Sequence, residues 1–228
     1  MIAPMVGWSF ATIAAYFAAR WLYDRVRFPL LHPMIVGIVV LATAIESLGR
    51  TYGEYREATG WIVWLAGPAV VAMAVPVYRL RTLLRSRAPI VITVIASGLV
   101  FGFTTMTWAF GLLGQPREVQ LAGPMHAITG PVAIPIARQI GARQDAMVIG
   151  ILTAGLIGAT VGPYLLRRIG IADRRARGLA LGCGSHAIGV ARALEVDSVC
   201  GAFATVGMMG NAILGAIIFP YLARWLIG

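Results

Sequence analysis

The stretch LGCGSHAIGVARALE occupies residues 181–195, between two long apolar segments near the C-terminal end of the chain. It contains three glycines, the adjacent pair Ser185 and His186, and the charged residues Arg192 and Glu195. It is therefore too polar and too rich in glycine for an ordinary lipid-facing helix. Irregular backbone at membrane depth is tolerated only where protein surrounds it or where it lines a wet cavity. The stretch thus predicts an interrupted segment inside a membrane protein.

The composition of the whole chain supports a membrane location. Of the 228 residues, 59% are hydrophobic and 12% are charged, whereas soluble domains carry about 25% charged residues. Six apolar runs approach the roughly 20 residues that a helix needs to cross a bilayer. The prediction is an all-α polytopic protein of the inner (plasma) membrane, one integral domain over residues 1–228 with about six transmembrane helices. The predicted spans are residues 5–23, 30–48, 60–78, 88–110, 146–166 and 199–223.

The net charge of +10 comes from arginine, because the chain contains no lysine. In a soluble protein such an excess would suggest nucleic acid. Here the arginines cluster in short loops between apolar runs, above all in residues 79–87 and 167–177. Topology and anionic lipid headgroups explain such loops better. The expected partner is therefore the lipid bilayer and not nucleic acid.

Two segments rich in helix breakers, residues 121–141 and 178–194, separate the last predicted spans. If the basic loops are cytoplasmic, the first four spans alternate in direction and the fourth ends outside. The fifth span must then also begin outside, because the basic loop 167–177 that follows it is cytoplasmic. Residues 121–141 then enter and leave on the outer face as a re-entrant or broken-helix hairpin. Residues 178–194 do the same from the cytoplasmic face. In the alternative topology, both segments cross fully and the arginines of 167–177 lie outside.

The two segments contain similar sequences. Residues 129–138 (TGPVAIPIAR) and 183–192 (CGSHAIGVAR) are identical at five of ten positions, although chance can produce such similarity in a chain rich in alanine, glycine and isoleucine. With the hairpin topology, units 121–166 and 178–223 form an inverted repeat. Secondary transporters are often built in this way, with their binding sites at interrupted helices near the bilayer midplane.

A small anion fits the chemistry of both segments. Thr129-Gly130-Pro131 has the pattern of a helix N-cap followed by proline at a first helical position. Gly184-Ser185-His186 occupies the equivalent place, with Ser185 as the expected cap. Two helix N-termini that enter from opposite faces would direct partial positive charge at one point, which suits a carboxylate. His126 and His186 could add hydrogen bonds.

Further residues have both a functional and a plain structural interpretation. Arg192 either contacts the substrate or extends to the membrane surface from a hairpin end. Pro68 interrupts the third predicted span, so a broken helix could contribute to the site. His186 could instead be a hydrogen-bonded packing residue. The ligand-site prediction consists of His126, Thr129, Gly130, Pro131, Gly184, Ser185, His186, Arg192 and Pro68.

Enzymatic chemistry is not expected from this sequence. It lacks a His-Glu-x-x-His motif and a phosphate-binding loop. Ser185 and His186 would point about 100° apart on a helix, so they cannot act as nucleophile and base to each other. Cys183 and Cys200 support neither a disulfide framework nor a zinc site. We expect no metal and no cofactor, apart from a coupling proton or sodium ion as a hypothesis.

Three motifs in order resemble the LrgB/CidB family, which includes the plastidal glycolate/glycerate translocator. They are LAGPAVVAMAVPVY at 65–78, HAITGPVA at 126–133, and RGLALG at 177–182, which leads into SHAIGVARALE at 185–195. The resemblance extends from about His32 to near the C-terminus. The family usually has lysine where this chain has His126, and a second threonine where it has Gly130, so affinity or substrate could differ.

The resemblance implies two alternative functions. The first is alternating-access transport of small monocarboxylate or 2-hydroxy-acid anions such as glycolate, glycerate or pyruvate. The second is holin/antiholin-like control of murein hydrolase export and cell lysis, together with a small LrgA/CidA-type membrane protein. We expect the first, with a partner protein or a homodimer completing the assembly.

Overall fold

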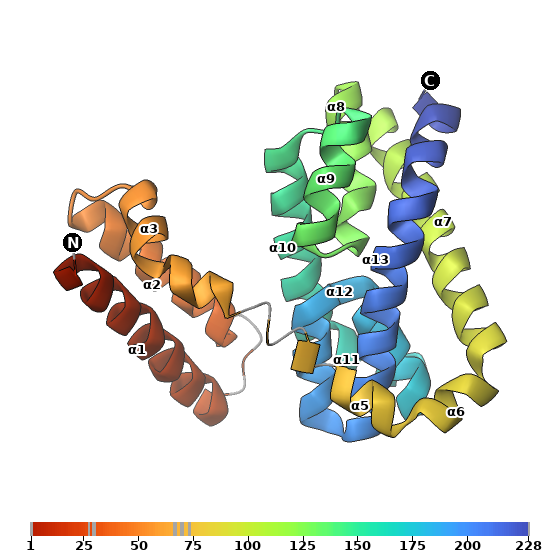
Figure 1. Cartoon of the computed structure of the whole chain (residues 1–228), viewed down its shortest axis with the longest axis horizontal. Helices are drawn as coiled ribbons and strands as arrows, with labels where there is room; N and C mark the ends of the chain where they lie inside the picture. The colour runs from red at the N-terminus through yellow and green to blue at the C-terminus, as the bar shows by residue number, and fades with distance from the viewer. Residues whose placement is uncertain are drawn as a thin grey trace. The chain divides into compact units, whose positions relative to one another are not determined.

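The computed structural model describes residues 2–26, 28, 31–65, 68, 71–72 and 74–227, and the described residues form helices and no strands. The chain divides into two compact units, Met1–Ala72 and Met73–Gly228. Each unit is helical (Figure 1). The single membrane domain expected over residues 1–228 stays a prediction.

The first unit contains α1 (Ile2–Val26), α2 (Pro33–Ser47) and α3 (Tyr52–Trp64). Helix α1 contacts both of the others. The indole N–H of Trp61 donates to Ser9 Oγ over 2.8 Å, and the rings of Trp8 and Tyr55 meet edge to face with centroids 5.6 Å apart. Polar and aromatic contacts thus join α1 to α3.

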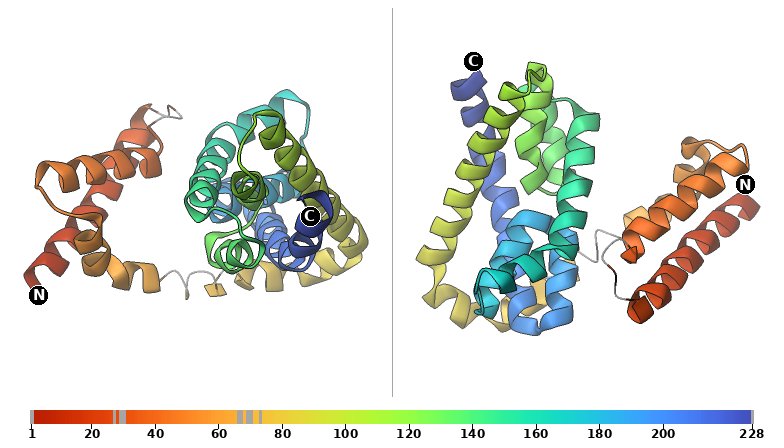
Figure 2. Two further views of the ribbon diagram at one scale, coloured as in Figure 1. Left: turned by 90° about the horizontal axis from the view of Figure 1, so that it is seen from above. Right: turned by 180° about the vertical axis from the view of Figure 1, so that it is seen from behind.

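The second unit contains the remaining elements, and Figure 2 shows it from above and from behind. Every fourth residue of α7 is buried, from Val91 to Thr107. This face packs against α13, where the rings of Phe103 and Phe219 lie 4.8 Å apart. The elements are α5 (Ala74–Arg79), α6 (Arg81–Ser86), α7 (Ala88–Leu112), α8 (Arg117–Ala122), the 3₁₀ helix η2 (Gly123–Ala127), α9 (Gly130–Ile140), α10 (Gln144–Thr160), α11 (Gly162–Arg168), α12 (Arg174–Val196) and α13 (Ser198–Ile227).

Two helices among the described residues are long and apolar enough to cross a membrane, Ala88–Leu112 and Ser198–Trp225. They coincide with the fourth and sixth predicted spans. Helices α10 and α11 pass the same test only together, with a bend of 51° between them. Within the third predicted span, 60–78, α3 ends at Trp64 and α5 begins at Ala74, and residues 66, 67, 69, 70 and 73 lie outside the described residues. The count of about six spans stays a prediction.

Both breaker-rich segments fold back on themselves. The backbone N–H of Arg143 donates to the carbonyl oxygen of Glu118 over 2.9 Å, so residues 117–143 return to their starting point and are called hairpin 1. The Arg174 guanidinium pairs with the Asp197 carboxylate over 3.5 Å, so residues 174–197 are called hairpin 2. Helix α10 follows hairpin 1 and α13 follows hairpin 2, and the two helices run in opposite directions (Figure 1).

Two helices have an aspartate at their N-terminal end: α10, which follows hairpin 1, and α12, which forms hairpin 2. Asp145 lies in the first turn of α10, and Asp173 caps α12 by accepting the Arg175 backbone N–H over 2.7 Å. A hydrogen bond from the Arg143 side chain lowers the pKa of Asp145, and the Arg175 side chain lowers that of Asp173. Both carboxylates therefore stay ionised at neutral pH, and negative charge at a helix N-terminus is stabilising.

Candidate functional site

Helix α12 is broken at His186. This residue has φ 41° and ψ −132°, the one positive φ outside glycine among the described residues. The first arm of hairpin 2 is residues 174–185 and the second arm is residues 187–196. Gly189 lies against the carbonyl of Leu181, although a straight helix would place residues eight apart about 12 Å from each other. The chain thus reverses at His186, one residue after the cap expected at Ser185.

The tip of hairpin 1 lies where η2 gives way to α9. Thr129 takes the N-cap position of α9 with φ −66° and ψ 142°, as predicted, and Pro131 is the second residue of the helix rather than the first. The predicted side-chain cap is wrong, because the Thr129 hydroxyl makes no capping bond. Instead, its carbonyl oxygen accepts the backbone N–H groups of Val132 and Ala133 over 3.0 and 2.9 Å.

The two tips meet through hydrogen bonds between residues far apart in the sequence. The His186 ring donates from Nε2 to the carbonyl oxygen of His126 over 2.7 Å. The Asn211 amide on α13 donates from Nδ2 to Ala127 O over 3.1 Å and to Cys183 O over 2.8 Å. We call these five residues the junction. It brings together hairpin 1, hairpin 2 and the helix that follows hairpin 2.

His126 contributes its backbone to the junction rather than its ring. The ring donates from Nδ1 to Gly123 O over 2.8 Å, within its own 3₁₀ turn. Both histidine assignments follow from chemistry, since a carbonyl oxygen can only accept. The His186 ring and the His126 carbonyl oxygen thus form the hydrogen bond of the junction, and contact of either histidine with a ligand stays a prediction.

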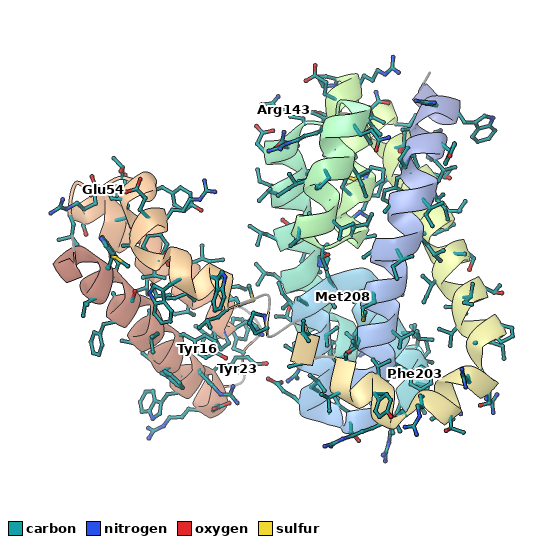
Figure 3. The ribbon with its side chains drawn as sticks, in the orientation of Figure 1. Tyr16, Tyr23, Glu54, Arg143, Phe203 and Met208 are labelled. Carbon is teal, nitrogen blue, oxygen red and sulfur yellow. The ribbon has the colours of Figure 1, made fainter. Side chains whose placement is uncertain are left out.

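Glycines on α10 and α12 allow hairpin 2 to lie close to its neighbours α10 and α13. A Cβ added at Gly158 would overlap Ser185 Oγ, and one at Gly155 would clash with Ile188. A Cβ at Gly182 would overlap the backbone carbonyl of Ala204. Phe203 and Met208 lie on the same part of α13 (Figure 3) and are buried. The absence of a side chain at these three glycines therefore lets hairpin 2 pack closely against its neighbours.

The other predicted site residues differ in their exposure and in whether they lie near the junction. Ser185 and His186 are buried, at 1% and 3% exposure, whereas Gly184 and Pro131 are exposed and Gly130 is half-buried. The Arg192 side chain pairs with Glu195 near the end of the second arm and makes no hydrogen bond to the junction. Pro68 is exposed and belongs to the first unit, with both neighbours outside the described residues. Contact of any of these residues with a ligand stays a prediction.

Sequence reasoning missed Asn211. Its side chain is 3% exposed, and Oδ1 is buried without a hydrogen-bond partner. The signal was available, because Asn211 is a lone amide in the apolar run 199–223, and polar residues in such runs often join helices or mark functional sites. No group of three or more metal-binding side chains occurs in the described part of the chain.

Comparison with known proteins identifies the family. The model of the LrgB-like family matches residues 12–225. The chain is 30% identical over 211 residues to "Holin-like protein CidB" of Staphylococcus epidermidis, and 28% identical to the protein of that name from Staphylococcus aureus, covering 92% of each chain in both cases. It is 32% identical over 215 residues to "Uncharacterized protein YxaC" of Bacillus subtilis, covering 94% of this chain and 93% of that protein. No solved structure matches. The chain is therefore a helical membrane protein that belongs to the LrgB-like family, as its motifs indicated.

Proposed function

We propose that this protein carries small monocarboxylate or 2-hydroxy-acid anions across the plasma membrane by alternating access. The observation that carries the proposal is the junction, where two chain reversals meet in the protein interior. Helix α9 begins directly after one reversal and the second arm of hairpin 2 directly after the other. Their free N–H groups and partial positive charge favour an anion.

The donors at the junction suit a carboxylate. His186 Nε2 and Asn211 Nδ2 now donate to backbone carbonyl oxygens of the facing tips. A carboxylate presents two strong acceptors and can take the place of those carbonyls. A ligand would thus replace hydrogen bonds between the tips with hydrogen bonds to itself. Such an exchange provides a physical link between binding and separation of the tips.

We further propose that units 121–166 and 178–223 form an inverted repeat with hairpins that enter from opposite faces, inside a multi-pass protein of about six spans. Its support is the order hairpin then helix in both units, the opposite directions of α10 and α13 (Figure 1), and the sequence similarity of the tips. Rocking of one unit against the other would expose the junction alternately to each side.

The hairpin topology predicts opposite labelling of two loops. In a Cys183→Ala, Cys200→Ala background, Arg143→Cys should react with a membrane-impermeant maleimide added to intact cells. Arg168→Cys, in the basic loop, should react only after permeabilisation. Both arginines are exposed, so burial does not limit the reaction. Labelling of both loops from the same side would contradict the topology.

The alternative function is holin-like control of cell lysis with a small LrgA/CidA-type membrane partner or as a homodimer. Its support is the name of the staphylococcal relatives, "Holin-like protein CidB". Neither function is enzymatic, in line with the names of the family and these relatives.

Uptake into proteoliposomes tests the proposal against this alternative. We expect the purified protein to accumulate labelled glycolate, lactate or pyruvate above protein-free liposomes, with an imposed proton or sodium gradient revealing the coupling ion. A flat trace for all three acids, with monodisperse protein, would refute transport. Changed autolysis on gene deletion without any change in uptake would favour the holin-like function.

A further inference from the structure

Asn211 uses only half of its hydrogen-bonding capacity. Its Nδ2 donates to one carbonyl from each tip, at 3.1 Å to Ala127 O and 2.8 Å to Cys183 O. Because both partners are acceptors, the amide cannot be flipped without placing two oxygens against its own oxygen. Its Oδ1 is therefore fixed as an acceptor. This oxygen is buried and has no partner.

The position of Oδ1 follows from the amide itself. The oxygen and nitrogen share one carbon atom, so Oδ1 lies beside the two carbonyl bonds at the junction. Asn211 is 3% exposed and His186 is also 3% exposed, so bulk water does not solvate this part of the protein. A buried acceptor without a donor is costly, and native proteins rarely retain one without a reason. The junction thus presents a fixed site for one hydrogen-bond donor.

We propose that Asn211 Oδ1 accepts a hydrogen bond from the hydroxyl group of the transported acid and makes the protein selective for 2-hydroxy acids over 2-keto acids. This inference rests on the proposed transport function. The carboxylate of the acid takes the N–H donors at the junction, and its 2-hydroxyl supplies the donor that Oδ1 lacks. A keto acid of the same size offers only acceptors, which leaves Oδ1 unpaired and places a second oxygen against it.

Lactate, pyruvate and propionate test this assignment, because they share a three-carbon skeleton and differ at carbon 2. The uptake assay should give a KM for one enantiomer of lactate at least about tenfold lower than for pyruvate or propionate, since loss of a hydrogen bond to a buried acceptor costs roughly this factor or more. Asn211→Leu removes the acceptor, so the ratio of KM values should fall to about one.

Two further variants separate selectivity from general damage. Asn211→Asp keeps an oxygen at the Oδ1 position and loses the N–H donors, so all KM values should rise while lactate stays preferred. Thr205→Val alters another buried polar residue of α13, whose hydroxyl bonds only to Gly201 O at 2.9 Å in its own helix, and should leave the ratio unchanged.

The outcomes are distinct. Equal KM values for lactate and pyruvate in the wild-type protein would overturn the selectivity assignment and leave transport intact, and so would a ratio that survives in Asn211→Leu. If Asn211→Leu does not fold, loss of the lactate preference in Asn211→Asp would overturn the assignment. Uptake of none of the three acids would refute the transport function and this inference with it.

Discussion

The His186→Ala variant is expected to take up a carboxylate substrate at less than about a tenth of the wild-type rate when the substrate is below saturation. The His186 ring provides an N–H donor at the junction, now bound to His126 O over 2.7 Å. A hydrogen bond to a charged group contributes about 1.5–3 kcal/mol, which corresponds to roughly a 10- to 150-fold change in affinity. Initial uptake rates over a range of substrate concentrations measure this effect as a rise in KM.

His186→Gly and His186→Gln are the matched controls. The backbone of His186, at φ 41°, lies in a region that glycine adopts freely and other residues adopt at a cost of about 1–3 kcal/mol. His186→Gly should therefore unfold at a higher temperature than His186→Ala while losing uptake equally. His186→Gln keeps an N–H donor and should retain part of the uptake. Wild-type uptake by well-folded His186→Ala would exclude this ring from the binding site.

The Gly182→Ala variant is expected to be destabilised by about 2–3 kcal/mol, a large effect for one methyl group. The added Cβ would overlap the Ala204 backbone carbonyl, and a backbone cannot move aside as a flexible side chain can. Alanine would gain up to about 1 kcal/mol of helix propensity, which the clash should exceed. Thermal unfolding in detergent, followed by tryptophan fluorescence, measures the difference.

Gly102→Ala provides the comparison for Gly182→Ala. Gly102 lies in the middle of α7, and nothing lies within 4 Å of a Cβ added there. Its substitution should leave the unfolding temperature unchanged or raise it slightly, because only helix propensity acts. An equal loss of stability in both variants would show that alanine is harmful for a reason other than the contact with Ala204.

Local signals in the sequence located both hairpins and the family. Glycine, proline and polar residues inside apolar runs predict broken helices because the bilayer tolerates such residues only within protein. The sequence TGP at residues 129–131 likewise predicted the start of α9, since threonine and proline favour the N-terminal positions of helices. The hydrogen bond between Arg143 and Glu118 and the ion pair between Arg174 and Asp197 agree with the predicted fold-back of the two segments.

Glycine content alone did not reveal which helix faces pack. Gly98 and Gly102 on α7 have open space beside them, whereas Gly155 and Gly158 on α10 lie against hairpin 2. Both α7 and α10 carry a pair of glycines three or four residues apart in apolar sequence. Only the position of hairpin 2 distinguishes the two helices. The close contacts of Gly158 with Ser185 depend on a fold-back that no local pattern specifies.

The sequence by itself determined a helical membrane protein with two interrupted segments, because hydropathy and helix breakers act over short stretches of chain. Only the tertiary structure decided which atoms meet between the segments. The bonds of the junction join residues 28, 60 and 84 positions apart, and such pairs are fixed by packing of whole helices. For that reason Asn211 and the carbonyl oxygen of His126 meet hairpin 2 at the junction. The pair of Arg192 with Glu195 and the bond of the His126 ring to Gly123 O, by contrast, join residues three positions apart and are local.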